Sequence, residues 1–279
     1  MTSHTKKSNP NINAHQEIPD PWNILYELEP LKFTDWELIE PENLKHYIDY
    51  TFIEMNEIVS ILEIGCGRGF RILSLILLDN EVNRIGVNIK CIDYSENAIK
   101  FANKMLKELQ GGKFPEAFKV YCEVYGGIIS KDLKDLINEN KVPSIKCNIE
   151  FIKQDVFEGF ENEVFDLVID WMCFHEIAVA QRDEYAQILS KVSGKLYILT
   201  VFYKDDKECS EIKYPEDELK KIGGNITKHR FTIEQLTEIF KEFHHIDFQN
   251  KIHHPMNVYA HSDGKEFPKI TILMSNLVK

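Results

Sequence analysis

Short apolar runs alternate with longer amphipathic runs along most of this chain. Apolar runs of five to ten residues are typical of strands buried in a sheet, and apolar residues recurring every three or four positions are typical of the helices that cover it. The apolar runs predict strands at 59–64, 85–92, 148–153, 165–170, 195–203, 244–254 and 269–277. Amphipathic runs predict helices at 70–78, 96–109, 130–140, 181–192 and 232–243. This order predicts an α/β fold around a mostly parallel sheet.

A glycine-rich turn joins the first predicted strand to the first helix. Gly65, Gly67 and Gly69 form a G-x-G-x-G pattern, and Phe70 stands where a glycine would complete the G-x-G-x-x-G of dinucleotide sites. Glycines permit a positive φ and let a ligand approach the backbone, and the helix start offers unpaired N–H groups. Glu63 lies inside the apolar strand and needs a partner or a polar cavity, because burying a bare carboxylate is costly.

This turn resembles motif I of the class I S-adenosylmethionine-dependent methyltransferases. In that family the acid and the glycines cradle the methionine end of the cofactor, which implies cofactor contacts for Glu63, Gly65, Cys66, Gly67 and Gly69. The resemblance implies a Rossmann-like, mostly parallel seven-stranded sheet with a C-terminal antiparallel hairpin and helices on both faces. The alternative is a tight turn that only packs helix on strand.

Two later strand ends match the same family by their order and spacing. Asp93 ends the second strand just before Ser95, which is a good N-cap for the next helix. The family binds the cofactor ribose with an acid at this position, and the following residue, here Tyr94, lies against the adenine. Asp155 and Val156 end the third strand, where the family recognises the adenine amino group. The alternatives are that Asp93 caps the helix and that Asp155 is an ordinary surface residue.

The end of the fourth strand carries the candidates for the methyl acceptor. Ligands of open α/β sheets bind outside the carboxyl ends of the strands, which makes Asp170 a candidate cofactor contact. Asp170 to Ile177 resembles the D-x-G-x-F/L-H-x-I segment of small-molecule methyltransferases, including relatives of thiopurine methyltransferase. Trp171-Met172 replaces the Arg-Gly that is common there. The added bulk narrows the pocket and puts a thiopurine or thiol acceptor in doubt.

Four residues are predicted to contact the acceptor: Trp36, Trp171, His175 and Tyr203. With an unperturbed pKa of about 6.5, His175 is also the candidate catalytic base, because it can take a proton near neutral pH. The alternative is a satisfied core histidine. An acceptor that arrives as a thiolate or a free amine needs no base at all.

Three regions lie outside the regular strand and helix pattern. Residues 1–18 are polar and predict a disordered tail. Residues 19–57 are rich in aromatic side chains and predict either a cap over the sheet or a lid over the ligands. Residues 111–147 predict a helical insertion that could shape the acceptor pocket. The insertion is too small to be a separate domain, so a single methyltransferase domain is predicted over 1–279.

Composition narrows the class of partner. The 279 residues are 43% hydrophobic, and 33 basic against 45 acidic residues give a net charge of −12. Without a dense basic cluster nucleic acid is a disfavoured substrate, and Lys228-His229-Arg230 is interpreted as solvated surface. No apolar run is long enough to span a bilayer, and the first residues lack a signal core. Six scattered cysteines favour a cytoplasmic protein with reduced thiols and no zinc site.

The preferred hypothesis is transfer of a methyl group from S-adenosylmethionine to a small-molecule acceptor by in-line displacement. One alternative is a non-catalytic cofactor-binding or scaffolding protein of the same fold. Another is a nicotinamide-dependent oxidoreductase, which Glu63 and the incomplete glycine pattern disfavour. Asp170 and Asp205 could mimic the acids of metal-dependent catechol-type enzymes, but the usual Asp-Asn pair is missing, so no metal is predicted. The sequence leaves the acceptor atom (N, O or S) and the oligomeric state open.

Overall fold

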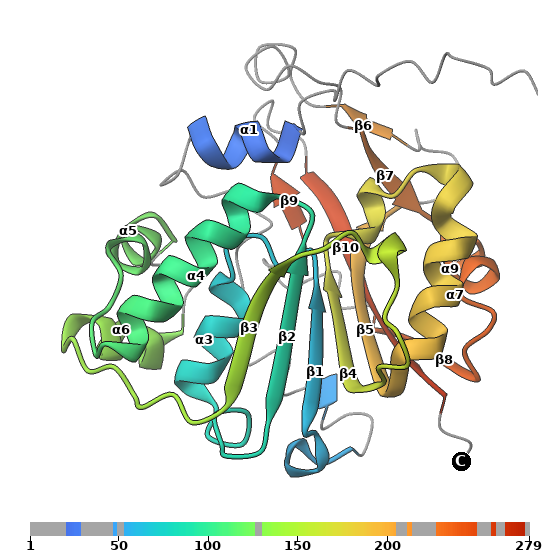
Figure 1. The fold of residues 1–279 in the computed structure, drawn as a ribbon. Coiled ribbons are helices and arrows are strands. Elements are labelled where there is room, and N and C mark those ends of the chain that lie inside the picture. The colour runs from blue at the N-terminus through green and yellow to red at the C-terminus, as the bar shows by residue number, and fades with distance from the viewer. Residues whose placement is uncertain are drawn as a thin grey trace, which may run out of the picture.

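The fold is a sheet with helices packed on both of its faces (Figure 1). The computed structural model describes residues 21–28, 47–48, 53–125, 130–204, 211–213, 227–249, 258–260 and 266–276. The main strands are β1 (Ser60–Ile64), β2 (Asn88–Asp93), β3 (Asn148–Lys153), β4 (Phe165–Trp171), β5 (Ser193–Tyr203), β8 (His245–Gln249) and β10 (Glu266–Ser275). Short strands are β6 (Glu211–Lys213), β7 (Thr227–Phe231) and β9 (Val258–Ala260).

The order of the main strands is β3-β2-β1-β4-β5-β10-β8. The first five strands in chain order pair in parallel, and β10 runs antiparallel to both β5 and β8. β1 is central: its last residue, Ile64, pairs with Ile92 of β2 on one side and with Asp170 of β4 on the other. This topology confirms the predicted fold class, including the antiparallel C-terminal hairpin.

Helices and single turns connect these strands. The helices are α1 (Pro21–Leu28), α3 (Phe70–Leu78), α4 (Glu96–Gln110), α5 (Glu116–Tyr125), α6 (Lys131–Asn138), α7 (Arg182–Val192) and α9 (Ile233–Ile239). The 3-10 turns are η2 (Met55–Glu57), η3 (Val156–Glu158), η4 (Phe174–Glu176) and η5 (Val179–Gln181). None of the helices in the described part of the chain is both long and apolar enough to cross a membrane.

The two faces of the sheet carry separate hydrophobic clusters, because side chains alternate along each strand. Ile61 of β1 packs with α3, α4, α5 and α6 in the first cluster. Leu62 and Ile64 pack with α7 and α9 in the second. Burial on both sides explains why these strands appear in the sequence as continuous apolar runs.

Local side-chain caps fix where the helices begin. The predicted caps are confirmed: Ser95 Oγ accepts from Ala98 N at 3.2 Å, and Ser130 Oγ accepts from Leu133 N at 3.2 Å. Thr232 and Gln235 form the predicted capping box at the start of α9. These contacts satisfy N–H groups that the first turn of a helix leaves unpaired.

Several element boundaries differ from the prediction. β2 begins at Asn88 rather than at Ile85, whose side chain is 83% exposed. The apolar run of 85–92 therefore includes a loop residue that contributes nothing to the core. α5 was not predicted, although its residues Ala117 and Phe118 are buried in the first cluster.

The interpretation of Lys228-His229-Arg230 as solvated surface is wrong. The three residues lie in β7, which pairs in parallel with β5 at Phe202 and Tyr203. Lys228 is only 2% exposed and Arg230 only 8% exposed. Alternation along the strand puts these two side chains on one face. There the Lys228 ammonium lies 5.6 Å from the centroid of the Phe202 ring, so the aromatic ring contributes to its burial.

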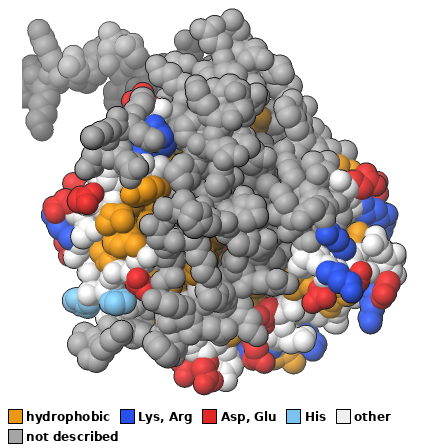
Figure 2. Space-filling model, turned by 180° about the vertical axis from the view of Figure 1, so that it is seen from behind, with side chains coloured by type: hydrophobic (Ala, Val, Ile, Leu, Met, Phe, Trp, Pro, Cys, Tyr) orange, Lys and Arg blue, Asp and Glu red, His pale blue; other side chains and the backbone are white. Residues whose placement is uncertain are grey.

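Some predictions fall outside the described residues, namely the tail over 1–18, Trp36 and Asp205. The single domain over 1–279 and most of the cap over 19–57 stay predictions. On the surface seen from behind, described Lys and Arg side chains lie among Asp and Glu (Figure 2). This mixture agrees with the absence of a dense basic run in the sequence.

Candidate functional site

A cavity of about 400 Å³ lies at the carboxyl edge of the sheet, where β1, β2, β3 and β4 end. Its wall comes from α1, the glycine turn, the loops after these four strands, and β7. Of the predicted site residues, it is lined by Gly65, Cys66, Gly67, Asp93, Tyr94, Asp155, Val156, Trp171 and His175. Glu63, Gly69, Asp170 and Tyr203 lie outside the lining. No described residue of the 111–147 insertion lines the cavity either, and its role in shaping the cavity stays a prediction.

The glycine turn needs its glycines for two different reasons. All three have positive φ: +62° at Gly65, +53° at Gly67 and +77° at Gly69. A Cβ on Gly65 would lie 2.7 Å from the Cβ of Cys173, and one on Gly69 would lie 2.7 Å from Cε1 of Phe151. Gly65 and Gly69 are therefore required for close packing. Gly67 brings its backbone to the cavity wall.

Asp93 joins the ends of the two neighbouring strands β1 and β2. Its Oδ2 accepts from Gly67 N at 2.8 Å, and its Oδ1 accepts from Ser95 N at 2.8 Å. Asp93 thus orders the turn before α4, while Ser95 itself caps the helix. Asp93 also lines the cavity, where a carboxylate can accept a hydrogen bond from a ligand hydroxyl. Tyr94 lies beside it and is 54% exposed.

The end of β3 forms the next section of the wall. Asp155 Oδ1 accepts from Phe157 N at 3.0 Å and begins η3. Val156 and Phe157 face the cavity with Asp155. The resulting surface combines one carboxylate with apolar side chains, which suits a flat heterocycle that carries an amino group.

Glu63 lies outside the cavity lining but forms an ion pair with Arg71, which lines it and which the sequence pattern did not indicate. Its side chain is fully buried, and its Oε1 accepts from Nη1 of Arg71 at 3.2 Å. The Arg71 guanidinium lies 5.1 Å from the centroid of the Trp171 ring, and both Arg71 and Trp171 line the cavity. Burial raises the pKa of Glu63 to about 7, against the opposing charge of Arg71.

This shift predicts a pH-dependent stability that Glu63→Gln removes. A carboxyl whose pKa rises from 4.5 unfolded to about 7 folded binds its proton more tightly in the folded state. Its contribution to the free energy of unfolding is therefore largest below pH 4.5 and is lost as the pH rises through 7. Between pH 5 and 8 wild type should lose about 2 kcal/mol through this group. Urea unfolding of both proteins across this range measures the difference. Parallel pH profiles would contradict it.

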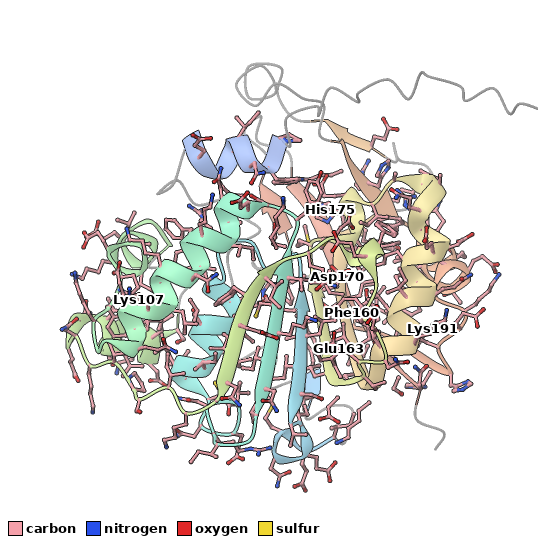
Figure 3. All side chains as sticks on the ribbon, viewed as in Figure 1. Lys107, Phe160, Glu163, Asp170, His175 and Lys191 are labelled. Atoms are coloured by element: carbon pink, nitrogen blue, oxygen red, sulfur yellow. The ribbon has the colours of Figure 1, made fainter. Side chains whose placement is uncertain are left out.

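Asp170 organises the loop after β4 from beneath the cavity. It is fully buried and accepts hydrogen bonds from the hydroxyl of Tyr185, from that of Tyr197 at 3.2 Å, from Cys173 N at 3.0 Å and from Phe174 N at 3.2 Å. Burial raises the pKa of Asp170 to about 6, although the hydrogen bond from Tyr185 opposes the shift. These contacts make Asp170 a positioning residue for the loop that carries His175, which lies above it in Figure 3.

His175 lies in η4 and lines the cavity, although it is only 1% exposed. Its Nε2 lies 3.2 Å from Oε1 of Glu176. The edge of its ring meets Phe202, with the centroids 4.9 Å apart. The imidazole therefore lies between a carboxylate and an aromatic ring where it borders the cavity. Its role as a base stays a prediction.

Helix α1 lies over the carboxyl ends of the strands (Figure 1). Its residues Trp22 and Tyr26 line the cavity. Asn23 fastens this helix to the start of α4. Its Oδ1 accepts from Ser95 Oγ at 2.8 Å and from Asn97 N at 3.0 Å. Part of the predicted aromatic cap thus lies over the ligand cavity itself. Within the described residues, no group of three or more His, Cys, Asp or Glu side chains could hold a metal ion.

No family model matches the chain, and no curated protein matches its sequence. The fold matches an S-adenosylmethionine-dependent methyltransferase from Methanosarcina mazei with a TM-score of 0.51 and 14% identity, over 83% of this chain and 98% of that one. A structure concerned with the conversion of a disulfide bond into a thioacetal group during echinomycin biosynthesis matches with a TM-score of 0.51 and 14% identity, over 93% and 92%. The chain has the class I methyltransferase fold.

A candidate O-methyltransferase from Nostoc punctiforme is also similar, with a TM-score of 0.48 and 12% identity over 91% of this chain. This chain spans 59% of the length of that protein.

In the class I methyltransferase fold described here, strand order reverses between β1 and β4, since β1 pairs with β2 on one side and β4 on the other. The cavity lies at this switch point, the usual ligand position in open α/β sheets.

Proposed function

We propose that this protein is an S-adenosylmethionine-dependent methyltransferase that acts on a small molecule. One observation carries the proposal. Three features line one cavity at the ends of β1, β2 and β3. They are a glycine turn with positive φ, the Asp93 carboxylate that accepts from Gly67 N of that turn, and the Asp155 carboxylate on an apolar wall. These three features fit an amino-acid group, a ribose and an adenine in that order.

The nucleoside part of the cofactor would lie along the ends of β2 and β3. Asp93, which lines the cavity, would accept hydrogen bonds from the ribose hydroxyls. Tyr94 would cover the adenine. Asp155 would accept from its amino group, beside the backbone of Val156.

The amino-acid part would lie against the glycine turn at the end of β1. Gly67 allows close approach because no Cβ stands there, and Gly65 and Cys66 extend the same surface. Arg71, which Glu63 holds by an ion pair, would supply the cation for the carboxylate of this part. Gly69 and Asp170 would act indirectly, through packing and loop position.

Methyl transfer requires little chemistry from the protein's own side chains. Bound S-adenosylmethionine would supply a methyl group that its sulfonium charge activates for in-line displacement by the acceptor, with S-adenosylhomocysteine as the leaving group. The protein's contribution is to hold both reactants in line, with α1 covering them from solvent. His175, which lies beside Glu176, is the proposed base for an acceptor that must lose a proton.

Asp93→Ala tests the cofactor assignment. The variant loses the proposed hydrogen-bond acceptor for the ribose and the carboxylate that accepts from Gly67 N. Each charge-assisted hydrogen bond is worth about 1.5–3 kcal/mol. Calorimetric affinity for S-adenosylmethionine should fall about tenfold or more. Wild type should bind S-adenosylmethionine and give no heat with NADH, which separates this proposal from an oxidoreductase.

The matched control is Asp166→Ala. Asp166 lies at the opposite end of the sheet, where its Oδ2 accepts from Val59 N at 2.8 Å and from Ser60 N at 3.0 Å. Its loss should lower the melting temperature and leave cofactor affinity unchanged. Equal affinity losses in both variants would mean that Asp93 acts only on folding, and the ribose assignment would fail.

A further inference from the structure

Met172 has a backbone conformation that residues with a side chain rarely adopt. Its φ is +66°, in the left-handed region that favours glycine. Within the described part of the chain, the other non-glycine residues with positive φ are Asn140 and Asn162, which are exposed and of a type that tolerates this region. Met172 is instead buried, with 6% of its surface exposed, and it lines the cavity. Strained residues of this kind cluster at ligand sites.

The strained conformation of Met172 is held by its surroundings. Its N–H donates to the carbonyl of Thr200 in β5 at 2.9 Å. The next residue, Cys173, donates its N–H to the buried Asp170 carboxylate at 3.0 Å. Both sides of the left-handed residue are therefore fixed, which is the condition for such strain to persist in a folded protein.

The left-handed conformation decides on which side of the sheet the Met172 side chain lies. Side chains alternate along β4, so Ile169 and Trp171 lie in the first hydrophobic cluster and Val168 lies in the second. Continued alternation would put residue 172 in the second cluster. Met172 lies instead in the first cluster with Trp171, and both side chains line the cavity. The strained turn thus gives this wall two large apolar side chains in succession.

The rest of this wall combines apolar side chains with charged groups that already have partners. Ile177 and Ala178 are its further apolar residues. Glu176 Oε1 lies 3.2 Å from His175 Nε2. The Lys228 ammonium lies over an aromatic ring and has a further interaction within the protein. Glu176 and Lys228 both line the cavity and carry opposite charges, so the wall does not require a charged acceptor.

We propose that Met172 is a specificity-determining residue and that the methyl acceptor is a flat aromatic molecule that packs against Trp171 and Met172. Aromatic rings pack favourably on one another, and a polarisable thioether makes favourable contacts with ring edges. Glycine would adopt the same φ without strain, so the effect of methionine here is its side chain, which limits the size of the ring system that fits. The inference rests on the proposed methyl transfer and adds the class of substrate.

The experiment compares aromatic acceptors of graded size. Full-length protein, labelled S-adenosylmethionine and a panel of phenols and aryl amines with one, two or three fused rings give kcat/KM for every compound. Calorimetry of the same compounds on protein loaded with S-adenosylhomocysteine measures binding without turnover. Wild type should prefer the smaller compounds over the three-ring ones by about tenfold to a hundredfold, the range expected when a filled site is overpacked.

Met172→Gly and Met172→Ala test the side chain. Both variants remove the thioether, but only glycine also relieves the backbone strain. Both should raise kcat/KM or affinity for three-ring compounds, relative to one-ring compounds, by about tenfold or more, and leave binding of S-adenosylhomocysteine unchanged. Asn162→Gly is the matched control, because Asn162 has φ of +60° but is exposed and lies outside the cavity lining. It should change neither the size preference nor cofactor affinity.

The outcomes separate the two proposals. Wild type that binds neither S-adenosylmethionine nor S-adenosylhomocysteine would overturn the proposed function. With normal cofactor binding, the inference alone fails if no aromatic compound binds or reacts, or if both Met172 variants keep the size preference of wild type.

Two further results would also overturn the inference. A loss of S-adenosylhomocysteine affinity in both variants would mean that Met172 contacts the cofactor. A changed preference in Met172→Gly alone would mean that backbone freedom, and not the side chain, sets the size limit. Improved use of three-ring compounds in both variants, with cofactor binding kept and Asn162→Gly unchanged, would support the inference.

Discussion

Asp170→Ala is expected to destabilise the folded protein by about 3–5 kcal/mol, because each buried donor left without its acceptor costs about 1–3 kcal/mol. The substitution leaves the hydroxyls of Tyr185 and Tyr197 and the N–H groups of Cys173 and Phe174 without their common acceptor. Urea unfolding measures the loss, and the melting temperature should fall on the order of 10 °C.

Two single deletions from the same network provide the comparison. Tyr185→Phe and Tyr197→Phe each remove one donor and keep the carboxylate with its two backbone partners. Each should cost about 1 kcal/mol, as a single buried hydrogen bond typically does. A loss in Asp170→Ala no larger than in either phenylalanine variant would show that the network does not hold the loop.

Gly67→Val is expected to abolish cofactor binding, with a loss of affinity of a hundredfold or more. The glycine has φ of +53°, which a β-branched residue adopts only with strain of about 1–3 kcal/mol. Its backbone lines the cavity, and its N–H is held by Asp93 at 2.8 Å. A valine side chain would stand where the bound cofactor must approach this backbone. Calorimetry with S-adenosylmethionine measures the effect.

Gly112→Val is the control that separates the effect of backbone strain from obstruction of the cofactor. Gly112 also has a positive φ, of +74°, and a Cβ there would meet nothing within 4 Å. It lies after α4, outside the cavity lining. The control should lose stability to a similar degree as Gly67→Val while binding the cofactor normally. Comparable affinity in wild type and Gly67→Val would contradict the placement of the cofactor.

That the residues at the ends of β1, β2 and β3 line one cavity could be predicted because each of them is local in sequence to a strand end. Each candidate, from the glycine turn to Asp93 and Asp155, directly follows an apolar strand. Carboxyl ends of parallel strands meet at one edge, so strand order alone brings these residues together. Gly69 shows the limit of such an inference. It belongs to the motif, yet it packs against Phe151, a partner 82 positions away in the chain.

Around the ends of β4 and β7, Trp171 and His175 were predicted and line the cavity. Their contacts could not be predicted, because they join distant segments. Asp170 was expected at the cofactor, but Tyr185 and Tyr197 come from a later helix and strand and close over it. Arg71 looks like an ordinary helix residue until Glu63 and Trp171 are seen beside it. Lys228 lies in a short strand whose polar composition is typical of a surface loop, and only its pairing with β5 explains its burial.

The loop after β4 is ordered by the protein itself. Asp170 binds the N–H groups of Cys173 and Phe174, and the Cys173 side chain packs where Gly65 leaves room for it. The segment that presents Trp171 and His175 is therefore already fixed before a ligand binds, so binding costs it little conformational entropy. Fixing a flexible residue would cost about 1–2 kcal/mol. Binding at this wall should therefore select for ligands whose shape fits a surface that is already formed.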